Sequence, residues 1–106
     1  MVKLYLMSRT HNFYAEGLYN PHNNHLFVLE GAKISAYPTL KVGKGKAKWL
    51  KMNTEYVKDG YLVQTLEFRT PSTAATFVSG TSMNGYARWK NENGKELRTI
   101  KESING

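Results

Sequence analysis

The stretch RTPSTAATFVSGTSMNGYARWK, residues 69–90, constrains the fold more than any other part of the chain. Thr70 is suited to cap the start of a helix, and Pro71 follows at the first helical position, where an N–H has no partner within the helix. Gly80 is suited to the left-handed conformation that ends a helix. These signals predict a short helix over residues 71–79. Its interior is mostly Ala, Ser and Thr, so another backbone can approach it closely.

The second half of the stretch predicts a turn followed by a strand. The pair Asn84-Gly85 is a strong signal for a tight turn. In the segment YARWK, a strand would carry Tyr86, Arg88 and Lys90 on one face and Trp89 on the other. The sequence NENGK then predicts another turn, and the chain is expected to end in a short strand or helix.

The first 40 residues predict a meander of three antiparallel strands. The segments VKLYLM, NFYAEGLYN and LFVLEGAKISAY are rich in large apolar residues, and the first alternates clearly. Gly17 is a candidate for a bulge in the second strand. The turn-forming sequence NPHNNH, residues 20–25, reverses the chain between the second and third strands.

Residues 41–58 combine a glycine-containing basic loop, KVGKGK, with a pattern that allows a helix over about residues 47–58. Asp59-Gly60 predicts a turn, and YLVQTLEF, residues 61–68, predicts a strand that leads to the helix at 71–79. The predicted fold is therefore α+β, with a small antiparallel sheet of about five or six strands and two short helices. At 106 residues, the chain is expected to form a single domain, residues 1–106.

The positive charge is concentrated in one segment. The chain has a net charge of +7, and residues 41–58 alone contribute +5, from six lysines and one glutamate. A cluster of this kind attracts an anionic partner. The alternative is a solvated lysine-rich surface with no partner, which is common in proteins.

Several classes of function are disfavoured. The eight carboxylates show no acid/base spacing, SGTSMNG is not a nucleophile elbow, and GKGKAK lacks the phosphate-loop spacing, so no enzyme activity and no cofactor are predicted. The chain has no cysteine, and three histidines without a matching acid do not predict a metal site. No apolar run is long enough to span a membrane, and the N-terminal segment does not resemble a signal peptide. We expect a cytoplasmic protein, in a bacterium or in the host of a phage.

Three groups of residues are candidates for contact with nucleic acid. The lysines supply charge for phosphates, the hydroxyls surround a helix start whose amides can hold one phosphate, and the last group combines an aromatic ring with two cations. These groups are Lys41, Lys44, Lys46, Lys48 and Lys51; Thr70, Ser72 and Thr73; and Tyr86, Arg88 and Lys90.

The segment LEFRTPSTAATFVSGTSMNGYARWKNENGKEL resembles a family of domains of unknown function. The matching positions are Phe68, Pro71, Ser72, Ala74, Ala75, Gly80, Asn84, Gly85, Tyr86, Trp89, Gly94 and Leu97. Domains of this family occur C-terminal to GIY-YIG nuclease domains and in restriction-associated proteins, and they are similar to the RAMA domain. Thr70 stands where serine is common, and Tyr86 where tryptophan is frequent.

The resemblance implies an accessory module associated with DNA. We therefore expect a non-catalytic nucleic-acid-binding module, for DNA rather than RNA, in a restriction or phage–host defence context. A nuclease or other defence-system protein is a further candidate partner. The alternative is a protein–protein interaction module, such as a phage-encoded protein that binds a host nuclease or defence component, because exposed Tyr, Trp and Arg are also typical of protein interfaces.

Overall fold

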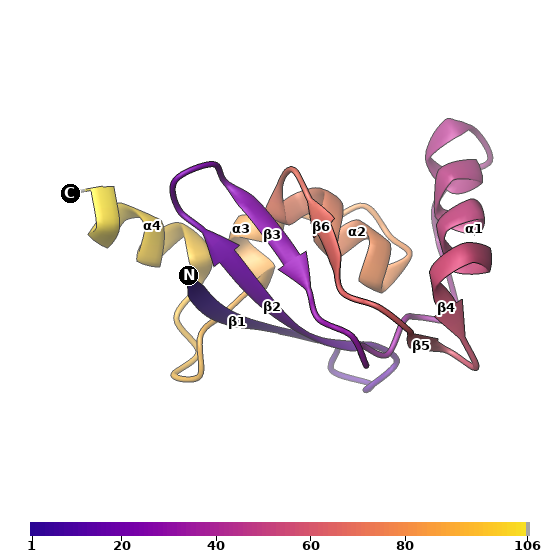
Figure 1. The fold of residues 1–106 in the computed structure, drawn as a ribbon, viewed down its shortest axis with the longest axis horizontal. Helices are drawn as coiled ribbons and strands as arrows, with labels where there is room; N and C mark the ends of the chain where they lie inside the picture. Colours follow the sequence, from indigo (N-terminus) through magenta and orange to yellow (C-terminus); the bar gives the residue numbers. More distant parts are fainter. Residues whose placement is uncertain (106) are drawn as a thin grey trace.

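Side chains alternate between buried and more exposed along the first three strands, which form an antiparallel sheet. In the computed structural model, which describes residues 1–105, β1 (Val2–Met7) pairs with β2 (Tyr14–Asn20), and β2 pairs with β3 (His25–Val28). A later strand, β6 (Leu66–Phe68), pairs with β3 and completes the order β1-β2-β3-β6. The fold class is α+β, as predicted, and Figure 1 shows helices α2 and α3 packed behind this sheet.

The third predicted strand is shorter than expected. It was expected to run to residue 37, but β3 ends at Val28 because the chain turns at Gly31, which has φ +93°. The Ala32 N–H donates to the Leu29 carbonyl across this turn. Beyond the turn, Lys33 still forms isolated bridges to Tyr14 and Tyr61.

Helix α1 (Lys44–Tyr56) begins three residues earlier than predicted. Gly43 precedes it at φ +151°, a conformation open to glycine, and the second half of the expected basic loop, residues 44–46, is helical. After α1, β4 (Val57–Lys58) and β5 (Tyr61–Leu62) form a hairpin. Its turn is Asp59-Gly60, as expected, with positive φ at both residues.

The predicted helix at residues 71–79 is confirmed. Helix α2 (Pro71–Ser79) is capped by the Thr70 side chain, which accepts a hydrogen bond from the Thr73 N–H, and it ends at Gly80 with φ +70°. A Cβ at Gly80 would lie 2.9 Å from the Cα of Pro38, so this glycine also permits close packing.

The strand predicted at residues 86–90 is wrong. Asn84 does not open a hairpin turn; its side chain accepts a hydrogen bond from the Tyr86 N–H and caps a short helix, α3 (Gly85–Arg88). The chain becomes extended at Trp89, and Lys90 pairs with Tyr5 through two backbone hydrogen bonds of 2.7 and 3.0 Å. Lys90 thus pairs with the middle of β1, at an edge that would otherwise be open to another strand.

The chain ends in α4 (Leu97–Asn105), so the described residues contain four helices rather than two. Figure 1 shows α1 and α4 at opposite ends of the long axis of the molecule, which extends 39 Å. None of the helices in residues 1–105 is both long and apolar enough to cross a membrane.

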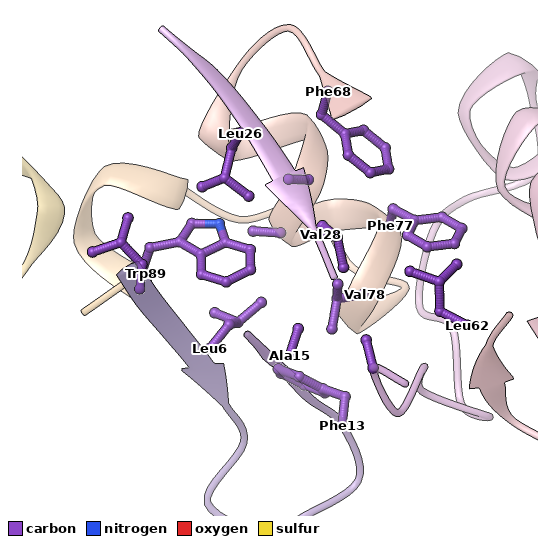
Figure 2. Packing of buried hydrophobic residues seen from close by; sticks show 14 of the residues in the cluster. Leu6, Phe13, Ala15, Leu26, Val28, Leu62, Phe68, Phe77, Val78 and Trp89 are labelled. Carbon is purple, nitrogen blue, oxygen red and sulfur yellow. The ribbon is translucent and has the colours of Figure 1, made fainter. Parts of the chain in front are cut away.

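Trp89 lies at the centre of the packing between the sheet and the helices. It is fully buried, and its indole N–H donates to the Pro71 carbonyl at 3.0 Å. A Cβ on Gly17 would lie 3.0 Å from the Trp89 ring, so Gly17 makes room for the indole, and β1 and β2 pair without the expected bulge. Figure 2 shows Trp89 beside Leu6 and Leu26, with Phe68 and Phe77 in the opposite part of the core.

Candidate nucleic-acid interface

Helix α1 carries three lysines on one exposed stripe. Lys44, Lys48 and Lys51 are spaced i, i+4 and i+7, which aligns them on one face of a helix. Trp49, on a neighbouring face of the helix, is buried, and its indole N–H donates to the Phe77 carbonyl at 2.9 Å. This contact holds α1 against α2, and the three lysines of the stripe remain exposed beside it.

The two remaining lysines of the predicted group lie off the stripe. Lys41 is exposed in the segment before α1, and Lys46 is half-buried on another side of the helix. Within residues 1–105, the ion pairs are Lys3–Glu16, His25–Glu67 and Arg98–Glu96, so none of the five predicted lysines has an acidic partner.

A small hollow, which we call the helix hollow, lies between α1 and α2. Its volume is about 250 Å³, and its walls are mainly apolar, with Trp49, Met52 and Phe77 among them. Lys48, Ser72 and Thr73 also line it, so members of the first and second predicted groups border one depression.

The three predicted hydroxyls already have partners within the protein. Thr70 and Thr73 bond to each other, with the Thr73 hydroxyl donating to the Thr70 carbonyl at 2.9 Å. The Ser72 hydroxyl accepts from the Gly85 N–H at 2.9 Å, which joins α3 to the start of α2. We therefore assign these hydroxyls a structural role, and a phosphate contact there stays a prediction.

The third predicted group, Tyr86, Arg88 and Lys90, does not share one surface in the structure. Tyr86 turns toward α4 and the β2–β3 turn, where its hydroxyl accepts from Asn24 Nδ2 at 2.7 Å and its ring centroid lies 5.1 Å from Lys101 Nζ. Arg88 and Lys90 instead line a separate, larger hollow. The common face expected for all three residues does not exist, because residues 85–88 are helical.

This larger depression, which we call the sheet hollow, has a volume of about 1120 Å³. It lies along β1, the loop after it, and the segment that follows α3. Its lining includes the aromatic residues Tyr5 and Tyr14 and the cations Arg9, Arg88 and Lys90. In residues 1–105, none of these three cations forms a salt bridge.

Sequence reasoning missed Tyr5, Tyr14 and Arg9. The alternation of β1 contained a signal for Tyr5, because buried Leu4 and Leu6 on either side place it on the opposite face. The register Met7↔Tyr14 then places Tyr14 on the same outer face. Arg9 follows the strand in a loop, and no pattern in the sequence points to it.

The sheet hollow also contains acidic groups. Glu92 and Glu96 line it, and Glu96 accepts from Arg98 Nε at 2.7 Å. Burial, followed by the nearby Glu16 carboxylate, raises the pKa of Tyr14 above its usual 10.0, so this phenol is neutral at physiological pH.

The two hollows share Met83, which lies in the link between α2 and α3. Lys48 of the helix hollow and the three cations of the sheet hollow therefore border adjoining depressions. Methionine is flexible and adapts its shape to what it contacts. The described residues contain no cluster of three His, Asp or Glu side chains that could hold a metal ion.

Most of the residues that carry the family resemblance are structural. Ala74, Ala75 and Leu97 are fully buried, Gly80 and Gly94 have positive φ, and Asn84 caps α3. In the structure, these positions therefore cap, end or pack elements of the fold.

The comparison with protein families agrees with the resemblance of residues 66–97 to a domain of unknown function. The model of one family, a domain of unknown function (DUF4357), matches residues 5–101. No curated protein and no solved structure matches the chain. Because the match covers nearly the whole chain, the protein belongs to the DUF4357 family of domains of unknown function.

Proposed function

We propose that this protein is a non-catalytic module that binds nucleic acid through α1 and the sheet hollow. The single observation that supports this proposal is the gathering of cations from distant segments around two depressions that share Met83, where none of these cations forms a salt bridge within residues 1–105. Lys48 comes from α1, Arg9 from the loop after β1, and Arg88 from α3. Cations that converge in this way suit the phosphates of a nucleic acid backbone.

DNA is proposed rather than RNA because residues 66–97 resemble domains that accompany nucleases and restriction proteins. A restriction or phage–host defence setting, in the cytoplasm, follows from the same resemblance. A nuclease or another defence protein would then be a second partner.

The test measures binding of a fluorescent DNA as a function of salt. Each phosphate contact on a duplex contributes about −0.9 to the slope of log K against log salt concentration. The double variant Lys44→Gln/Lys48→Gln should lose about 1.8 from the magnitude of that slope and bind roughly 60-fold more weakly at 0.1 M salt, if both lysines neutralise a phosphate.

The matched control removes two charges elsewhere. Lys58 and Arg69 are exposed and line neither hollow, so Lys58→Gln/Arg69→Gln should keep most of the slope. Equal losses of DNA affinity and of salt slope in both variants would indicate a general effect of net charge. Absence of binding to single- or double-stranded DNA at about 50 mM salt would refute the proposal.

A protein partner is the second candidate, favoured by the composition of the sheet hollow. Tyr, Arg and Met side chains line it, and these residue types are enriched at protein interfaces. A partner captured from lysate that remains bound after nuclease treatment would support this candidate, whereas loss after treatment indicates bridging by nucleic acid.

A further inference from the structure

We propose that the sheet hollow binds single-stranded nucleic acid, with bases stacked on Tyr5 and Tyr14 and phosphates contacted by Arg9, Arg88 and Lys90. The inference rests on the proposed function and adds to it the form of the ligand. It is supported by the position of two aromatic rings on a pair of hydrogen-bonded strands, along a hollow that is also lined by three cations without a salt bridge in residues 1–105.

The two tyrosines share one face of the sheet. Tyr5 pairs with Glu16, and Tyr14 lies two residues before Glu16 on β2, so the tyrosines are diagonal neighbours on the face that α2 does not cover. Tyr14 is 38% exposed, and Tyr5 is half-buried with Lys3 Nζ 6.0 Å from its ring centroid. Both rings are therefore held on paired strands and still lie along a hollow.

The three cations line the same hollow as these rings. Lys90 is fixed to Tyr5 by the two backbone hydrogen bonds between them, and Arg88 precedes it by two residues at the end of α3. Arg9 follows β1 and is exposed. Since none of the three has an acidic partner in residues 1–105, a phosphate would not have to displace a carboxylate.

A duplex does not suit this arrangement as well as a single strand. In a duplex, each base is covered on both faces by its neighbours, so a tyrosine ring within a hollow meets only backbone and base edges. In a single strand, the base faces are free, and stacking on aromatic side chains is a general mode of recognition that tolerates any sequence.

The test compares a 12-nucleotide oligo-dT with a 12-base-pair duplex at about 0.1 M salt, where phosphate contacts remain strong. Wild-type protein should bind the single strand more tightly. Replacing both rings in Tyr5→Leu/Tyr14→Leu should weaken single-strand binding by roughly 30-fold or more, since each stacked base contributes substantially, and should leave duplex binding within about twofold.

Two control variants isolate the role of the rings. Tyr5→Phe/Tyr14→Phe keeps the rings and should bind the single strand within about twofold of wild type. Tyr37→Leu/Tyr61→Leu removes two exposed tyrosines that do not line the hollow and should also bind normally.

Photo-crosslinking supplies a measurement that needs no variant. A single strand that contains 5-iodouracil should crosslink to Tyr5 or Tyr14 of the wild-type protein, and crosslinks confined to other residues would overturn the inference. Tighter binding of the duplex, or equal losses for both DNAs in the leucine variant, would overturn it as well. Failure to bind either DNA would instead refute the proposed function.

Discussion

The substitution Gly85→Ala tests the joint between α2 and α3 that positions Arg88 and Lys90. A Cβ at residue 85 would lie 2.3 Å from the carbonyl carbon and oxygen of Pro71 and 2.5 Å from the nitrogen of Ser72. All three atoms belong to the backbone, so no side-chain rotation can relieve the contact. Because non-bonded carbon atoms need about 3.5 Å, α3 would have to move away from α2 by about 1 Å.

Such a movement would lengthen two hydrogen bonds beyond a useful distance. The Gly85 N–H to Ser72 Oγ bond is 2.9 Å, and the Trp89 Nε1–H to Pro71 carbonyl bond is 3.0 Å. Each contributes about 0.5–1.5 kcal/mol net. Steric crowding in a packed region costs about 1–3 kcal/mol more, so the free energy of unfolding should fall by about 2–6 kcal/mol.

Urea denaturation followed by circular dichroism measures this change, and the m-value should stay constant. For a domain of this size, the loss corresponds to a decrease in Tm of at least about 8 °C. Gly45→Ala is the control, since a Cβ there meets no atom within 4 Å and Gly45 lies in the first turn of α1; it should not destabilise the protein. A loss below about 1 kcal/mol for Gly85→Ala would refute the described packing, because crowding alone costs at least that much.

Two further predictions concern stability. Thr70→Ala removes the cap of α2 and should lower the free energy of unfolding by about 1 kcal/mol in urea denaturation, whereas Thr54→Ala, at an exposed position in α1, should not destabilise the protein. Burial, followed by the nearby Tyr86, raises the pKa of Tyr19 above 10.0. Stability should therefore not depend on this group below pH 10 and should fall above it, because the unfolded chain loses the proton first. Tyr19→Phe should show a shallower fall above pH 10, and an unchanged pH dependence would contradict this assignment.

Local signals in the sequence predicted the structure correctly where residues close together in the chain determine the geometry. The cap, proline and terminal glycine of α2 act within one helix, so the predicted bounds at residues 71–79 agree with the structure. The meander likewise depends on neighbouring strands joined by a short turn.

The predictions were wrong where one residue fits two different local structures. Asn84-Gly85 fits a hairpin turn, but the same asparagine caps a helix when the next glycine packs against Pro71. Gly17 suggested a bulge, but it makes room for Trp89, which is 72 positions later in the sequence. Both outcomes depend on contacts between distant residues, which a local pattern does not contain.

The candidate site was predictable only in part for the same reason. Charge alone identified the lysines of α1, but the sheet hollow joins β1, the loop after it and the segment after α3. Arg9 belongs to no periodic pattern in the sequence. Arg9 and Arg88 line one hollow only because Lys90 pairs with Tyr5 and brings the segment after α3 to β1.

Trp89 connects the scaffold to the proposed site. Its burial fixes residue 89 between Gly17 and Pro71, and its two neighbours along the chain, Arg88 and Lys90, are exposed and line the sheet hollow. The burial of Trp89, one of the positions that carry the resemblance, thus helps to determine where these two cations lie. Tyr5, Tyr14 and Arg9 lie outside the segment that carries the resemblance. The candidate contacts along β1 and β2 therefore come from a different part of the chain than the segment that carries the resemblance.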